Sequence, residues 1–302
     1  AEGSTTYYDK LIPARAGLMS GDQLLESLGG QIRSTRDRPA RRVQSVAAAS
    51  FDAWTVFNRP TPDHVNCSIS FYTKGSMVSF LLDLEVRRLT EGRASLDTVM
   101  SMLFDRFPLN ARGYTTADLK AILTEVTGAD FSPFFERYVD GVEPLPLEEA
   151  VRALGLELVQ DPRTPEDGEA SVDEDEDGFP DRPWIGLDLR DSDGRTMVRS
   201  VRSDGPAYLA GLQAGDEIVA MDGRRVSAGD LDAFLRRQVR DAREARRAAA
   251  SAGEPFPDRR LRVTFFRRDR LREVVFSVAT RPDASWTLRR RGDATDAQKQ
   301  AY

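Results

Sequence analysis

The chain has 302 residues, and its 43 lysine and arginine residues against 49 aspartate and glutamate residues give a formal net charge of −6. This near balance argues against a basic surface that binds nucleic acid. The length accommodates two domains, and the 40% hydrophobic and 30% charged fractions are typical of a globular protein. No apolar run approaches the ~20 residues that a membrane-spanning helix needs.

His64 is the only histidine and Cys67 the only cysteine. Cys67 cannot form an intrachain disulfide, and the redox compartment stays open. Because most catalytic zinc sites use two or three imidazoles, we expect that the chain cannot supply such a site by itself. The sequence begins Ala1-Glu2-Gly3 without a methionine, so we expect a fragment or a cut form of a longer protein.

The first half of the chain, residues 1–158, has apolar residues at helical spacing and predicts an all-helical domain. Ser95 is expected to cap one of these helices, and Thr115 with Asp118 to form a capping box for another. In the helix over 75–89, one face is apolar and predicted to be buried. The expected helices cover residues 22–35, 41–54, 75–89, 95–104, 115–126, 132–139 and 146–154.

A change of pattern follows. Residues 159–182 are rich in acidic residues and lack apolar anchors, which predicts a solvated linker. Residues 183–281 alternate with the period of strands and contain two helices, over 207–212 and 228–243, so we expect a small α+β domain. The polar tail over 282–302 is expected to extend over the surface. The predicted strands cover residues 184–189, 197–201, 217–221, 261–266 and 272–278.

The segment Gly205–Gly223 resembles the PDZ domains of bacterial proteases. In it Pro206 starts a short helix, Gly211 and Gly215 permit tight turns, and Asp222-Gly223 closes a hairpin. The resemblance implies a small β-barrel or sandwich with helices that binds an extended peptide at a sheet edge. It also implies that the loop Trp184-Ile185-Gly186-Leu187 captures the terminal carboxylate of the peptide. The alternative is that these four residues only pack the domain.

The first half resembles the M61 (glycyl aminopeptidase) family of zinc peptidases. The motifs follow in family order, and the Tyr-x-Lys-Gly motif before a helix is similar also to gluzincin aminopeptidases. The resemblance implies a gluzincin-type C-terminal part of a catalytic domain in a bacterial protein, cytoplasmic or periplasmic. The residues that carry it are Ala1–Asp9, Ser50–Trp54, Arg59-Pro60, Ile69–Gly75, Ser95–Asp97, Gly113–Thr115 and Phe134–Gly141.

By this resemblance Glu2 is the third zinc ligand and Tyr72 donates its hydroxyl to the oxyanion of the tetrahedral intermediate. No His-Glu-x-x-His motif occurs, so both histidine ligands and the glutamate base are expected upstream of Ala1. Taken alone, Glu2 is an exposed acid near a helix start, and Tyr72 is a buried tyrosine at a loop–helix junction.

Two other candidates are weaker. His64 lies in a loop and is expected to be an ordinary loop histidine. The acidic run Asp173–Asp181 resembles the start of a calcium loop, but Trp184 stands where an EF-hand needs glutamate. The sequence thus predicts the C-terminal part of a zinc aminopeptidase that acts on peptides, inactive by itself, with a peptide-binding PDZ domain. The alternative is a non-enzymatic PDZ binding protein with a relic peptidase domain.

Overall fold

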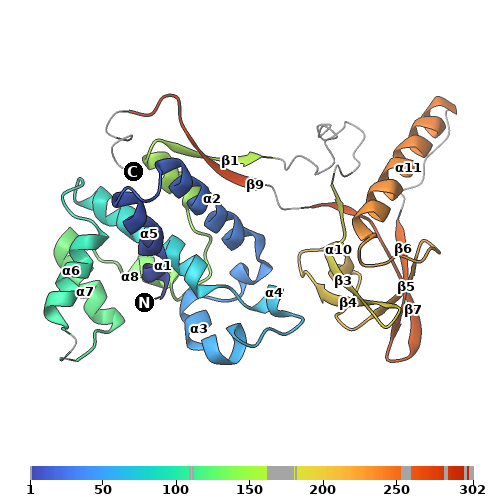
Figure 1. Ribbon diagram of the computed structural model, residues 1–302, viewed down its shortest axis with the longest axis horizontal. Helices are drawn as coiled ribbons and strands as arrows, with labels where there is room; N and C mark the ends of the chain where they lie inside the picture. Colours follow the sequence, from blue (N-terminus) through green and yellow to red (C-terminus); the bar gives the residue numbers. More distant parts are fainter. Residues whose placement is uncertain are drawn as a thin grey trace. The chain divides into compact units, whose positions relative to one another are not determined.

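The computed structural model describes residues 2–108, 110, 112–161, 180, 182–252, 260–281, 285–295 and 298. The chain divides into two compact units (Figure 1). Unit 1 comprises Ala1–Arg59, Cys67–Asp161 and Ser285–Tyr302, and unit 2 comprises Pro60–Asn66 and Pro162–Ala284. No helix within the described ranges is long and apolar enough to cross a membrane.

Unit 1 is mainly helical, and hydroxyl side chains start several of its helices. Ser95 and Thr115 cap their helices as predicted, and Thr115 forms a capping box with Asp118. The expected helix over 41–54 is instead interrupted into a 3-10 turn, a short helix and a π-helical turn. The helices of unit 1 are α1 (Glu2–Arg15), α2 (Gly21–Asp37), α3 (Val46–Phe51), α5 (Phe71–Leu89), α6 (Leu96–Arg106), α7 (Thr116–Thr127), α8 (Ser132–Tyr138) and α9 (Leu147–Ala153). The short helix α4 (His64–Cys67) belongs to unit 2 except for Cys67.

Helix α5 is the central element of unit 1. It begins at Phe71, earlier than predicted, because the Ser70 hydroxyl accepts a hydrogen bond from the Thr73 amide and caps the first turn. The predicted apolar face is buried, with Met77 and Val86 fully enclosed. This helix contributes to two hydrophobic clusters, one shared with α2 and α9 and the other with α6 and α7.

The described residues before Leu156 contain helices and no strand, but the expected all-helical domain over residues 1–158 ends in a strand, and unit 1 contains a two-stranded antiparallel sheet. Strand β1 (Leu156–Asp161) pairs with β9 (Ser285–Arg290), which lies in the polar tail of the sequence. Leu156 is fully buried, and Leu288 packs against the same cluster. The pairing brings together segments that flank unit 2, so no local pattern in the tail could indicate it.

Unit 2 contains a five-stranded antiparallel sheet with the strand order β3-β4-β5-β6-β7 and a small second sheet of β2 and β8. Its helices are α10 (Pro206–Leu209) and α11 (Leu231–Ala252). The strands are β2 (Pro183–Trp184), β3 (Leu187–Ser192), β4 (Arg195–Val201), β5 (Glu217–Met221), β6 (Leu261–Arg267), β7 (Arg270–Phe276) and β8 (Ala279–Thr280).

This sheet is open, so the closed barrel, one of the two forms expected (a β-barrel or a sandwich), is wrong. Strands β3 and β7 lie at opposite edges and do not pair with each other. One face is closed by a helix instead, because Phe234 and Leu235 of α11 pack with Val263 and Phe265 of β6 in the hydrophobic core. An open sheet keeps edge strands, and an edge strand presents backbone groups that another chain can pair with.

An ion pair explains part of the PDZ-like sequence motif. Asp216, 1% exposed, binds Arg267 through two contacts of 2.7 Å. Its carboxylate also accepts a hydrogen bond from the Gln213 amide, and Arg267 donates to the Gly211 carbonyl. The aspartate after Gly215 thus fastens the turn before β5 to the end of β6.

Candidate functional site

The first turns of α1 and α5 touch through two glycines. A Cβ atom on Gly3 would lie 2.6 Å from the Gly75 Cα atom, so the two backbones are in direct contact at this point. Farther along the same two helices, the Ser4 and Ser79 hydroxyl oxygens lie 3.0 Å apart. Residues later in α1 contact residues later in α5, so the two helices run in the same direction.

This parallel packing brings the first turns of both helices to the same end. Glu2 precedes Gly3 and is exposed, and Tyr72 lies one helical turn before Gly75. Tyr72 is 42% exposed, which contradicts the alternative of a buried junction tyrosine. Its ring centroid lies 4.4 Å from that of Phe71 and 6.1 Å from that of Phe57.

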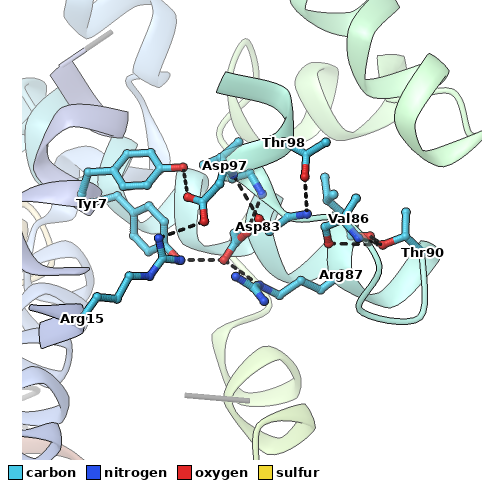
Figure 2. A network of polar contacts seen from close by, with 12 residues as sticks. Tyr7, Arg15, Asp83, Val86, Arg87, Thr90, Asp97 and Thr98 are labelled. Atoms are coloured by element: carbon cyan, nitrogen blue, oxygen red, sulfur yellow. Dashed lines mark hydrogen bonds and ion pairs between the residues drawn. The ribbon is translucent and has the colours of Figure 1, made fainter. Parts of the chain in front are cut away.

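A buried carboxylate fixes the middle of this helix pair (Figure 2). Asp83 of α5 accepts hydrogen bonds from the Tyr7 hydroxyl at 2.9 Å, the Arg87 Nε at 3.0 Å and the Leu96 amide at 2.7 Å. Burial, followed by the charge of Asp83, raises the pKa of Tyr7 far above its ordinary value. The phenol therefore stays protonated and remains a donor to Asp83.

A second set of hydrogen bonds, centred on Asp97, extends the network toward the C-terminal end of α1. Tyr8 donates its hydroxyl to Asp97 Oδ1 at 2.8 Å, and Arg15 reaches Asp97 Oδ2 at 2.9 Å. Burial and the hydrogen bond to Asp97 raise the pKa of Tyr8. Asp97 belongs to the first turn of α6, so α1 is tied to both α5 and α6. These bonds set the position of α1, and with it the position of Glu2.

The described residues do not form a metal site by themselves. No group of three histidine, cysteine, aspartate or glutamate side chains that could hold a metal ion occurs among them. Glu2, a carboxylate at an exposed helix start, fits as one ligand of a site that needs further ligands from elsewhere. His64 begins α4 and is half-buried in unit 2. The acidic run 173–181 that resembles a calcium loop lies outside the described residues.

The loop Trp184–Leu187 of unit 2 connects β2 with β3. Gly186 has φ +78°, and a Cβ atom there would lie 2.9 Å from the Gly205 Cα atom, so this position requires glycine. The Ile185 carbonyl accepts from the Ala207 amide at 3.0 Å and the Gly186 carbonyl from the Arg202 amide at 2.9 Å. The loop is thus fixed against the segment that leads into α10.

Strand β3 follows this loop directly and is an edge strand, because only β4 neighbours it in the sheet. Leu187 and Leu189 pack against the core, so the strand is anchored on one face. Its other edge faces no strand among the described residues. An edge strand next to a fixed loop has the geometry that strand addition by a peptide requires.

The comparisons with known proteins agree with the two units. Residues 1–78 match the family model of the M61 glycyl aminopeptidases, and residues 183–275 match the model of the PDZ domain. The chain therefore combines part of an M61 glycyl aminopeptidase domain with a PDZ domain. No curated protein matches the chain.

Solved structures add information on the fold. The crystal structure of an aminopeptidase N family protein from Idiomarina loihiensis is similar, with 24% identity and a TM-score of 0.74. The match covers 99% of this chain and 47% of that one, so the chain spans about half the length of that protein. The HtrA-type protease AlgW with a decapeptide matches with 20% identity and a TM-score of 0.24, over 33% of this chain and 30% of that one.

Sequence reasoning missed the residues that hold the site together. Gly3, Asp83 and Asp97 were not predicted to act, although each bonds or packs α1 onto its neighbours. A charged residue in the apolar face of a predicted helix is a usable signal, because a buried charge needs a partner. Asp83 is such a residue, because it lies among the apolar residues of the predicted helix over 75–89 and is buried. The contact of Gly3 with Gly75 has no local signal, since glycine is common at helix starts and turns.

Proposed function

We propose that the complete protein is a zinc-dependent aminopeptidase with a gluzincin-type catalytic domain, and that this chain supplies part of its site. The observation that carries the proposal is the contact between Gly3 and Gly75. It sets the first turns of α1 and α5 against each other within the residues that match the M61 model. The substrates are peptides, hydrolysed at N-terminal residues such as glycine or alanine.

Tyr72 is the proposed donor to the transition state. Its side chain is exposed enough to reach a substrate, and the capped first turn of α5 holds its backbone. In peptide hydrolysis the carbonyl oxygen of the scissile bond gains negative charge, and a positioned O–H group stabilises that charge. The Tyr72 hydroxyl acts only by hydrogen bonding to that oxygen.

Glu2 is the proposed metal ligand of this chain. Two histidines with one carboxylate form a common catalytic zinc set, and His64 is the only histidine here. The other ligands and the general base are therefore assigned to a part of the protein outside residues 1–302. When bound, zinc supplies Lewis-acid chemistry to the hydrolysis. The 302-residue chain alone is expected to be inactive.

The test compares two tyrosine variants of the complete protein. Tyr72→Phe is expected to lower kcat by ~10²–10³ with little change in KM, because the hydroxyl acts only in the transition state. Tyr114→Phe is the matched control, since Tyr114 is equally exposed (46%) and lies outside α1 and α5. An unchanged kcat of Tyr72→Phe sinks the proposed role of Tyr72.

A second test concerns Glu2 and does not depend on activity. Glu2→Gln is expected to lower the zinc content of the purified complete protein, because an amide is a weaker ligand than a carboxylate. Asp9→Asn is the control, because Asp9 is an exposed acid of the same helix. Equal zinc content in all three proteins would remove Glu2 from the metal site.

The alternative function is a non-enzymatic module that binds peptides through unit 2. The edge strand β3 and the loop Trp184–Leu187 favour this function on their own. Titration of the 302-residue chain with a peptide that has a free C-terminal carboxylate is expected to shift the amide resonances of β3 and of this loop. The same peptide with an amidated C-terminus is the control, and equal shifts would argue against carboxylate capture by the loop.

The two functions separate in the complete protein. Zinc-dependent peptidase activity supports the enzyme, and peptide binding without any such activity supports the module. Both outcomes leave the assignment of unit 2 as a PDZ domain unchanged, because that assignment rests on residues 183–275.

A further inference from the structure

A short segment from the first half of the sequence belongs to unit 2. Residues Pro60–Asn66 lie between α3 and α5 along the chain, yet they form part of unit 2, and unit 1 resumes at Cys67. The family model of the PDZ domain matches residues 183–275 and does not include this segment. The segment lies instead within residues 1–78, which match the M61 model. The peptidase half of the sequence therefore supplies a part of unit 2.

Asn66 fastens this segment to the end of β4 through its side-chain amide. The Asn66 Nδ2 donates to the Val201 carbonyl at 2.7 Å, and the Asn66 Oδ1 accepts from the Ser203 amide at 2.8 Å. Nδ2 also donates to Asp63 Oδ1 at 2.8 Å, within the segment itself. A carbonyl only accepts and a backbone amide only donates, so the flipped side-chain amide would lose both contacts to β4 and its turn. The half-buried Asn66 is thus held in one orientation.

The residue between these two contacts is bonded to the loop Trp184–Leu187. The Arg202 amide donates to the Gly186 carbonyl at 2.9 Å, and the Arg202 guanidinium lies over the Trp184 ring, 5.6 Å from its centroid. Asn66 binds the residues on both sides of Arg202 and therefore fixes the backbone that makes these contacts. A displacement of that backbone would displace the loop with it.

The place of this attachment matters for the peptide site. Val201, to which Asn66 donates, is the register partner of Leu187, the first residue of the edge strand β3. A terminal carboxylate is captured only where several N–H groups of a loop converge on it, whereas strand pairing is spread along the whole edge. A small shift of the loop should therefore weaken carboxylate capture more than it weakens pairing with β3.

We propose that the segment Pro60–Asn66 is a positioning element for the loop Trp184–Leu187 in the peptide site of unit 2. Asn66 fixes the backbone around Arg202, and the bond from Arg202 to Gly186 holds the loop in the form that captures a C-terminal carboxylate. Asn66 acts through the loop and does not itself touch the peptide. This inference rests on the peptide-binding function proposed for unit 2, and it does not depend on zinc or on peptidase activity.

The first test needs no ligand and measures whether Asn66 fixes the loop. Amide hydrogen exchange is followed by NMR in the native 302-residue chain, in Asn66→Ala and in Asn66→Asp, which keeps the shape of the side chain but not its donors. The Arg202 amide is expected to exchange at least about 10-fold faster in both variants. Asn58→Ala is the matched control and should leave this rate unchanged, since Asn58 is an exposed asparagine of unit 1.

Two results of this experiment overturn the proposal. One is an unchanged exchange rate of the Arg202 amide in Asn66→Ala and Asn66→Asp. The other is a loss of protection throughout β6, the strand between β5 and β7, in both variants. That loss would mean that Asn66 supports the whole sheet and has no role specific to the loop.

The second test separates positioning of the loop from general support of the fold. The probe is a pool of short peptides of randomised sequence with a free C-terminal carboxylate, and the same pool with amidated C-termini is the comparison. Asn66→Ala is expected to weaken binding of the free-acid pool about 10-fold and to leave binding of the amidated pool unchanged, because the amidated peptides use only pairing with β3. Asn58→Ala should bind both pools like the native chain. Unchanged binding of the free-acid pool by Asn66→Ala, or equal weakening of both pools, overturns the proposal.

The native chain distinguishes this inference from the function on which it rests. If the native chain does not prefer the free-acid pool, carboxylate capture by unit 2 is wrong, and the role of Asn66 in it is wrong as well. If the native chain prefers the free-acid pool and Asn66→Ala keeps that preference in full, only the inference about Asn66 is wrong.

Discussion

Helix α5 carries two buried charges of opposite sign, and the structure treats them differently. Asp83, 4% exposed, accepts hydrogen bonds from a phenol, a guanidinium and a backbone amide. Lys74, 3% exposed, has no hydrogen-bond partner for its Nζ within the described part of the chain. Burial alone therefore does not indicate the role of a charged side chain. A charge with all its partners holds the fold together, whereas a buried charge without them costs stability.

The middle of α5 should respond most strongly to mutation. Asp83→Ala is expected to lower the free energy of unfolding by about 3–5 kcal/mol, because Tyr7 and Arg87 lose their acceptor inside the protein. Urea denaturation of the 302-residue chain measures this loss. Asp9→Ala is the control, since Asp9 is an exposed acid paired with Lys10 and should cost less than about 1 kcal/mol. An equal, small loss in both variants would contradict the structural role of Asp83.

A smaller loss of unfolding free energy is expected for a substitution at the contact between α1 and α5. Gly3→Ala would bring a Cβ atom to 2.6 Å from the Gly75 backbone, so the helices must move apart. Overpacking of this kind costs about 1–3 kcal/mol. Gly30→Ala in α2 is the matched control, because its Cβ atom would meet only a flexible arginine end at 3.7 Å. The control should gain about 0.5–1 kcal/mol from the better helix former. A gain in both variants would show that the contact is looser than described.

The smallest effect on stability is expected for a substitution of Lys74, and the direction in which this effect changes with pH can be predicted. At neutral pH, Lys74→Met is expected to be at least as stable as the native chain, because it removes a buried charge without a described hydrogen-bond partner. Burial and Arg41 lower the pKa of folded Lys74, so the unfolded chain binds more protons. The native chain therefore gains stability as the pH rises through the lowered pKa toward 10.5, the ordinary lysine value.

Unfolding free energies measured at several pH values from 7 to 10 check this sign. The advantage of Lys74→Met over the native chain should shrink as the pH rises, because folded Lys74 becomes neutral. Lys10→Met is the control and should show no such trend, since Lys10 is exposed. An advantage that grows with pH would contradict the lowered pKa, and a strongly destabilised Lys74→Met would indicate a structural partner for Lys74.

Much of each unit could be predicted from local patterns. The apolar face of α5, the caps at Ser95 and Thr115 and the PDZ-like segment around Gly215 follow from spacing and turn chemistry, which act between near neighbours. The predicted helix over 41–54 is only partly present. A pattern rich in alanine and valine suits a helix, but the chain there forms a 3-10 turn, a six-residue helix and a π-helical turn.

The candidate site likewise has one part that the sequence predicts and another that only the structure reveals. Glu2 and Tyr72 were named from motifs along the chain, and their roles remain proposals. That their helix ends lie together follows only from the contact of Gly3 with Gly75, which the two motifs do not encode separately. The expected barrel does not form because its closure would require β3 and β7 to pair, and they do not. The sequence of a single strand does not indicate whether two distant strands pair.

The sequence by itself determined the helical character of the first half, the PDZ domain of the second and the residues that carry both resemblances. Periodicity and turn residues act over a few positions and can be read there. Only the tertiary structure decided that β1 pairs with β9, that α1 lies against α5, and that Asp83 has partners where Lys74 has none. Burial and pairing depend on residues distant in the chain, so the two charges of α5 could be assigned different roles only after folding.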